Sequence, residues 1–271
     1  MRKLGYLVVE GPHDVEFCYR LLSVAGLSRV QLLKDLDKDL EELVPRSFPH
    51  GGDLQKRVPV PLFLQNEQYA IAIHSAVGDS RLVATLQETL ATLDASAFTG
   101  LGIMLDSDSE KSASERYDAL RHKVRQEIGL VMPDRAGTVS SDQPRLGAYV
   151  LPDNTSQGTL ENLLLESAAL QYPALLPAAA DYVNTAWHTG LIPANHQDDI
   201  RKPAGRNKAV IGAMASLFKP GKAVQTSIQD NDWLRSAALN LPSILAVQQF
   251  LAELFKLVPL NDAQVRPQDA A

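Results

Sequence analysis

Short, nearly unbroken apolar runs, each followed by an amphipathic helical stretch, constrain the fold of this chain most. Leu4 to Val9 is the first such run and predicts a strand buried on both faces. Further runs lie at 70–75, 101–105 and 145–151. The segments with helical spacing of apolar side chains are 14–25, 80–93, 112–128 and 159–170. Four strand-then-helix units in succession predict an α/β fold, with a parallel-type sheet of about four strands and helices on both faces.

These four units predict an α/β domain over residues 1–170. A charged, helix-like piece and a stretch with Pro and Gly interrupt the pattern at 31–68, which we interpret as an insertion. No strand signal recurs after 171, so residues 171–258 are expected to form a helical extension packed on the α/β domain. The polar residues 259–271 predict a flexible tail.

Composition narrows the class of protein. The net charge of −6 argues against a basic coat protein of nucleic acids, but not against an enzyme whose acidic site is neutralised by metal ions. The single cysteine, Cys18, excludes an intramolecular disulfide and a multi-cysteine zinc site, and its apolar neighbours predict a buried thiol. The chain shows neither a signal-peptide core nor an apolar run long enough for a membrane span, so a cytoplasmic location is expected.

Acidic residues stand repeatedly where the predicted strands end. Glu10 directly follows the first strand, and Asp106 directly follows Leu105, with Asp108 two residues further on. Asp153 and Glu161 follow the fourth strand. Ligands of open parallel sheets bind outside the carboxyl ends of the strands, so several of these carboxylates are expected in one crevice. Carboxylates without His or Cys companions favour Mg2+ or Mn2+ over Zn2+.

Each acid also has a structural interpretation. Asp106 and Asp108, followed by a serine and a helix, are compatible with a plain N-cap. Glu161 and Asp14 are compatible with acids of a first helical turn, which the helix dipole favours. Glu10 is the hardest of the group to explain in this way, because an acid that ends an apolar strand and precedes Gly-Pro has no evident capping duty.

Two segments resemble the motifs of the Toprim family. Residues 7–17, with Glu10-Gly11 and Asp14 after a hydrophobic strand, are similar to the opening Toprim motif. Residues 103–108, ending in Asp106-Ser107-Asp108, are similar to the second motif, Asp-x-Asp. Ile71-Ala72-Ile73 with Gly78, Pro152-Asp153-Asn154 and Gly158-Thr159-Leu160-Glu161 resemble further landmarks of the OLD (overcoming lysogenization defect) nucleases and their stand-alone relatives.

The resemblance covers roughly residues 4–169 and implies a metal site. In OLD nucleases an acid four residues after the first Glu and a Glu after the last strand join the metal set. The implied ligands here are Glu10, Asp14, Asp106, Asp108 and Glu161. They would hold two Mg2+ or Mn2+ ions, and Glu10, Asp106 and Lys208 would be the catalytic residues. The chain departs from OLD proteins because it has no Gly-x-x-x-x-Gly-Lys-Ser/Thr loop, so any ATPase would be a separate partner.

A local excess of positive charge lies at 200–229, which contains six Lys and Arg residues and no Asp or Glu: Arg201, Lys202, Arg206, Lys208, Lys219 and Lys222. Cations near a metal site can clamp phosphates, although a solvated helix surface explains any single member. Lys208 is the best individual candidate, because OLD-like proteins present a Lys from a helix in this region. His13 is compatible with a phosphate contact or with a plain loop position, and His74 is expected to be structural.

Two functions are compatible with these features. The first is a Mg2+- or Mn2+-dependent phosphodiester hydrolase that cleaves nucleic acid by a two-metal mechanism. The second is a non-catalytic Toprim-like module that binds metal or nucleotide and regulates a separate ATPase. The sequence does not distinguish DNA from RNA as a substrate or endonuclease from exonuclease action, and it leaves the oligomeric state open.

Overall fold

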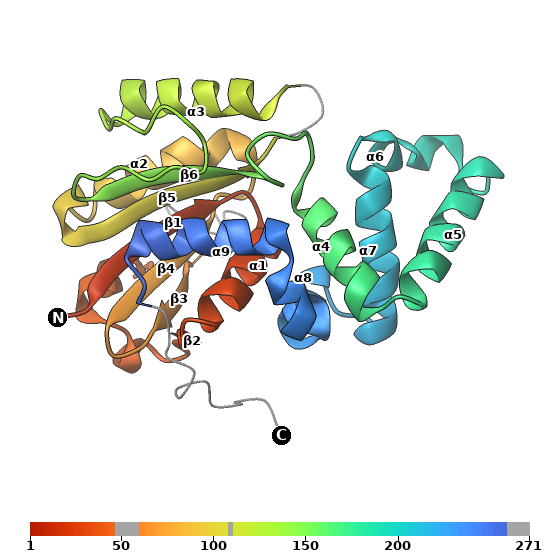
Figure 1. The fold of residues 1–271 in the computed structure, drawn as a ribbon, viewed down its shortest axis with the longest axis horizontal. Helices are drawn as coiled ribbons and strands as arrows, with labels where there is room; N and C mark the ends of the chain where they lie inside the picture. The colour runs from red at the N-terminus through yellow and green to blue at the C-terminus, as the bar shows by residue number, and fades with distance from the viewer. Residues whose placement is uncertain (47–59, 108–110, 259–271) are drawn as a thin grey trace.

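A computed structural model describes residues 1–46, 60–107 and 111–258. Its centre is one six-stranded sheet, with strands in the order β2-β3-β4-β1-β5-β6 (Figure 1). The strands are β1 (Lys3–Val9), β2 (Ser28–Arg29), β3 (Leu62–Gln65), β4 (Tyr69–Ser75), β5 (Phe98–Asp106) and β6 (Arg145–Leu151). β4, β1, β5 and β6 run parallel, whereas β3 and β2 add antiparallel pairs at one edge.

The four segments predicted as strands are the four parallel strands, and the α/β class is confirmed. The expected count of about four strands is not confirmed, because the sheet has six. The two additional strands are short: β2 has two residues, and β3 lies in the segment interpreted as an insertion. Runs of two and four residues are too short for a periodic pattern to reveal, so sequence analysis missed both.

Helices cover both faces of the sheet, as predicted (Figure 1). On one face lie α2 (Leu82–Leu90) and α3 (Ala113–Glu127), which share a core with Tyr6, Val8 and Ile103. On the other face lie α1 (Pro12–Ser23) and α9 (Pro242–Phe255). The side chains of β1 alternate between these two cores, since successive residues of a strand point to opposite faces.

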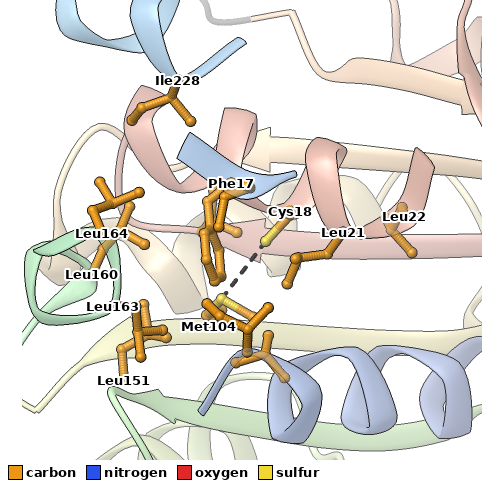
Figure 2. Packing of buried hydrophobic residues seen from close by; sticks show 14 of the residues in the cluster. Phe17, Cys18, Leu21, Leu22, Met104, Leu151, Leu160, Leu163, Leu164 and Ile228 are labelled. Carbon is orange, nitrogen blue, oxygen red and sulfur yellow. Dashed lines mark hydrogen bonds between the residues drawn. The ribbon is translucent and has the colours of Figure 1, made fainter. Parts of the chain in front are cut away.

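The core beside α1 contains the single cysteine. Cys18 is completely buried, and its Sγ lies 3.6 Å from Sδ of Met104 on β5, as Figure 2 shows. Phe17, Leu21 and Leu164 pack around this pair (Figure 2). The prediction of a buried thiol is confirmed, and desolvation raises the pKa of Cys18 well above its ordinary value.

After β6 the described chain is helical. The helices are α4 (Leu160–Gln171), α5 (Leu175–His188), α6 (Asp198–Arg201), α7 (Gly205–Phe218) and α8 (Val224–Asp230), followed by α9. α5, α6 and α7 project to one side of the sheet, while α9 returns to it and packs on β5 and β6 (Figure 1). The division into residues 1–170 and 171–258 stays a prediction. α9 lies in the second range of the sequence but packs on the sheet, which belongs to the first range.

The segment interpreted as an insertion is more regular than expected. Its charged piece forms two 3-10 helices, Leu33–Asp35 and Lys38–Leu43, in place of one longer helix. Leu40 is buried against the sheet and fixes this piece. Residues 47–59, and the predicted tail at 259–271, lie outside the described residues. Among the helices of the described ranges, none combines the length and the apolar character that crossing a bilayer requires.

Candidate functional site: a carboxylate cluster at the sheet edge

The carboxyl ends of two central strands place two of the predicted acids together. β1 and β5 pair in parallel with Val9 opposite Met104, so Glu10 just after β1 and Asp106 at the end of β5 are neighbours. The backbone N–H of Asp106 donates to Oε1 of Glu10 over 2.9 Å. Both acids therefore stand at the edge where parallel sheets bind ligands.

Two helix starts bring in further acids. Asp14 lies in the first turn of α1 and Glu161 in the first turn of α4, and both are buried, with 8% and 4% exposure. Asp106 is electrostatically repelled by Asp14, Glu10 and Glu161. The structure thus brings together four of the five predicted ligands. The fifth, Asp108, lies outside the described residues.

Burial and the charges of neighbouring acids make Asp14 and Asp106 poor anions. Desolvation, followed by the charges of Glu10 and Glu161, raises the pKa of Asp14 to about 7, although the N–H of Gly11 opposes the shift. Desolvation is also the largest cause that raises the pKa of Asp106, with Asp14, Glu10 and Glu161 adding to it. A cluster that disfavours its own ionisation in this way is stabilised by a cation or by protons.

Each of the four carboxylates accepts a hydrogen bond from the protein itself. Oε1 of Glu10 accepts a hydrogen bond from the backbone N–H of Asp106, and Oδ2 of Asp14 accepts one from the N–H of Gly11 at 2.8 Å. Oδ1 of Asp106 accepts a hydrogen bond from the N–H of Leu160 at 2.9 Å. Oε2 of Glu161 accepts one from the hydroxyl of Thr159 at 2.7 Å. Within the described ranges, no three His, Cys, Asp or Glu side chains converge as a group that could hold a metal ion. Side-chain rotations would be needed to bring the oxygens onto a common ion.

These contacts revise two expectations. Glu10 does have a structural partner, because it accepts the backbone N–H of Asp106 and so joins the ends of β1 and β5. Asp106 does not cap the helix that follows it, because Ser112 caps α3 in a capping box with Glu115. Asp106 instead accepts the N–H of Leu160, the first residue of α4. It therefore stabilises the start of a helix that is distant in the sequence.

Asp153, which also follows a strand, stands apart from the cluster. Its carboxylate accepts hydrogen bonds from the N–H and hydroxyl groups of Thr155 and Ser156. Partial burial opposes ionisation, but these donors outweigh it and lower the pKa of Asp153 to about 2. Asp153 is thus the acid of a tight turn, the structural role that Asp residues commonly take there.

Arg116 is a site residue that sequence analysis missed. Its Nη2 lies 3.4 Å from Oε1 of Glu10, its Nη1 3.1 Å from Oδ2 of Asp79, and its Nε donates to the carbonyl oxygen of Asp106 over 3.2 Å. The side chain is only 16% exposed. Because Arg116 stands among several charged residues of α3, its spacing carried no signal that set it apart from a solvated helix face.

Lys208 lies on the exposed side of α7, and its role stays a prediction. Burial lowers the pKa of His13 in the first turn of α1, the charge of Glu161 opposes this shift and that of Lys208 adds to it. His13 therefore lies within electrostatic range of both. His74, by contrast, shares a hydrogen bond of 2.6 Å with the hydroxyl of Tyr6, which confirms the expected structural role.

Three other cations of the predicted basic strip contact residues outside the acidic cluster. Lys202 pairs with Asp199 and Lys219 with Asp230, acids that lie just outside the range scanned in the sequence. The guanidinium of Arg206 stacks over the ring of Trp187 at 5.0 Å. These three cations thus have partners within the helical part, whereas the charge of Lys208 acts on His13 beside the acids.

Comparisons with known proteins place the chain in a family. A family model described as "Protein of unknown function (DUF3226)" matches residues 5–256. A crystal structure of a hypothetical protein from Pyrococcus horikoshii OT3 is similar, with 17% sequence identity, a TM-score of 0.49, and coverage of 96% of this chain and 97% of that chain. No curated protein matches the sequence. Because the family model spans nearly the whole chain, this protein belongs to the DUF3226 family.

Proposed function

We propose that this protein is a Mg2+- or Mn2+-dependent phosphodiester hydrolase that acts on nucleic acid, as its resemblance to Toprim nucleases implies. The observation that carries the proposal is the gathering of Glu10, Asp14, Asp106 and Glu161 at the carboxyl edge of the parallel strands. The acids come from separate elements, and the charges of Glu10 and Glu161 disfavour the ionised forms of Asp14 and Asp106, which is costly for a fold unless the cluster serves a ligand.

The donor set suits a hard divalent cation. All four side chains offer oxygen, the ligand that Mg2+ and Mn2+ prefer, and the sequence adds Asp108 two residues beyond Asp106. Asp106 interacts with each of the other three, so we propose it as the ligand shared by two ions. When bound, such ions would supply the Lewis-acid chemistry of phosphodiester hydrolysis, which is activation of a water molecule and stabilisation of the leaving oxygen.

The surrounding residues have duties of their own in this proposal. In the metal-free protein, burial and the charge of Glu10 raise the pKa of Asp14 to about 7, so binding of a cation there would release a proton near neutral pH. Glu10 stands beside Asp106 at the strand ends and is the second acid assigned to catalysis. Lys208 supplies positive charge near Glu161 and His13, where it would attract a phosphate of the nucleic acid.

One observation favours a second candidate. Because each carboxylate accepts a hydrogen bond from the protein and no three described ligands converge, the cluster is also compatible with a non-catalytic module. Such a module would bind metal or nucleotide and regulate a separate ATPase. Metal binding without cleavage of any nucleic acid distinguishes this candidate from the hydrolase.

The proposed activity is tested by incubating the protein with plasmid DNA, single-stranded DNA and RNA, each with Mg2+, with Mn2+ and with a chelator. Asp106→Asn is the test variant and Asp142→Asn, at an exposed aspartate, is the matched control. We expect metal-dependent cleavage by the wild type and the control and none by Asp106→Asn. Equal cleavage by wild type and Asp106→Asn would point to a contaminating nuclease and contradict the proposal.

A further inference from the structure

Arg116 joins three parts of the molecule at the cluster. Its guanidinium contacts Glu10 after β1, Asp79 after β4 and the carbonyl oxygen of Asp106 on β5. It sits near the N-terminus of α3, where the helix dipole disfavours positive charge. The stability of α3 therefore gives no reason for an arginine at this position, whereas the acids around it do.

The three contacts of Arg116 are unequal. The contacts to Asp79 and to the Asp106 carbonyl measure 3.1 and 3.2 Å, whereas the contact to Glu10 measures 3.4 Å. Oε1 of Glu10 already accepts the N–H of Asp106 at 2.9 Å. The contact between Arg116 and Glu10 is thus the longest of the three, and the other two hold the guanidinium in place without it.

We propose that Arg116 is a built-in counter-ion that competes with a divalent cation for Glu10 and binds a substrate phosphate once that cation is present. This inference rests on the proposed function, because it takes the cluster to be a divalent-cation site. When Glu10 turns to the metal, Nη2 of Arg116 loses its acidic partner while Nη1 and Nε keep theirs. A guanidinium fixed in this way presents a donor suited to phosphate oxygens.

Removing the charge then has two effects of opposite sign. Metal affinity rises, because a competing and repelling cation is gone, while affinity for a nucleic-acid phosphate falls. A purely structural arginine would not produce this split, because loosening the site would weaken both. The split separates the proposal from a role in packing.

The test uses the full chain and isothermal titration with Mn2+. The variants are Arg116→Gln, Arg116→Lys and, as the matched control on the same helix, Arg121→Gln, which pairs with the exposed Asp134. We expect Arg116→Gln to bind Mn2+ about two- to fivefold more tightly than the wild type, the effect of one partly exposed ion pair. Arg116→Lys and Arg121→Gln should match the wild type in Mn2+ affinity.

Binding of nucleic-acid phosphate is measured by the fluorescence anisotropy of labelled single-stranded DNA and RNA. Ca2+ takes the place of Mn2+ in this assay so that binding is measured without cleavage. Both Arg116→Gln and Arg116→Lys should bind whichever of the two nucleic acids the wild type binds more tightly about two- to fivefold more weakly than the wild type does. Glutamine lacks the charge, and lysine keeps the charge but lacks the planar guanidinium fork. An Mn2+ affinity of Arg116→Gln that equals or falls below that of the wild type would overturn the inference about Arg116 and leave the proposed function standing. Absence of Mn2+ binding in the wild type and all variants would overturn the proposed function as well.

Discussion

At Asp106, burial and the charges of three other acids act in the same direction, against ionisation. Asp106→Asn keeps the oxygen that accepts the N–H of Leu160 but removes the charge. We expect this change to raise the melting temperature of the metal-free protein, because repulsion within the cluster is relieved. Activity should fall by more than about a hundredfold, because loss of a mere hydrogen-bonding partner of a metal ligand already costs about 10- to 100-fold and Asp106 is proposed as a ligand itself. Differential scanning fluorimetry and a cleavage assay check the two effects, and a large fall in melting temperature would show a structural acid instead.

Asp14 makes the stability of the metal-free protein depend on pH. Its folded pKa of about 7 lies above the ordinary value of 3.8, so the folded state binds the proton more tightly than the unfolded state. The stabilisation from this proton is complete below the unfolded pKa and is lost as pH rises through about 7. Thermal unfolding between pH 4 and pH 8 should therefore show a steeper loss of stability in the wild type than in Asp14→Asn. Parallel pH profiles for the two proteins would contradict the assignment.

At the scale of elements, α9 packs directly against the backbone of β5 where that strand has glycines. A Cβ added at Gly100 would lie 2.3 Å from the carbonyl oxygen of Leu254, and one at Gly102 would lie 2.5 Å from a methyl of the same residue. Backbone of a helix cannot move aside as a flexible side chain can. The glycines of β5 thus set the distance at which α9 covers the sheet.

Gly100→Ala tests this close approach. We expect a loss of stability of about 1–3 kcal/mol, the usual cost of overpacking a core. Gly212→Ala is the matched control, because an added Cβ at Gly212 in α7 meets no atom within 4 Å. That control should stabilise α7 by about 0.5–1 kcal/mol, since alanine favours helices over glycine. Urea unfolding measures both, and similar effects of the two changes would contradict the packing argument.

The elements also show what sequence patterns reveal and what they miss. The parallel strands were predictable because a strand buried on both faces must be a continuous apolar run, and the acids after them were predictable because they interrupt such runs. β2 and β3 are too short to show a period. Arg116 and the bond from Leu160 to Asp106 depend on three-dimensional neighbours that no local pattern encodes.

At the scale of the whole molecule, the last described helix completes the core on one face of the sheet. α9 packs on β5, β6 and β1, so the range 1–170 lacks part of its own core. We expect a fragment of residues 1–171 to fail to fold cooperatively, because the apolar face covered by Phe250, Leu251 and Leu254 would meet water. Circular dichroism and size-exclusion chromatography beside the full chain check this. A sharp, reversible thermal transition of the fragment would show that α9 is dispensable.

Two helices that follow the sheet in the sequence, α4 and α7, also contribute residues to the proposed site. Asp106 accepts the N–H of Leu160 at the start of α4, and Lys208 on α7 acts electrostatically on His13. The sheet supplies the strand-end acids and the helical part supplies a buried acid and a cation. The proposed site therefore depends on both parts of the chain.

The central claim is that the carboxylate cluster binds a divalent cation, and direct Mn2+ binding tests it most simply. Free Mn2+ is followed by electron paramagnetic resonance as wild type, Asp106→Asn and Asp142→Asn are titrated near pH 7.5. We predict saturable binding by the wild type and by Asp142→Asn, and a loss of at least about tenfold in affinity in Asp106→Asn. Equal Mn2+ binding by all three proteins, or none by the wild type, would contradict the claim.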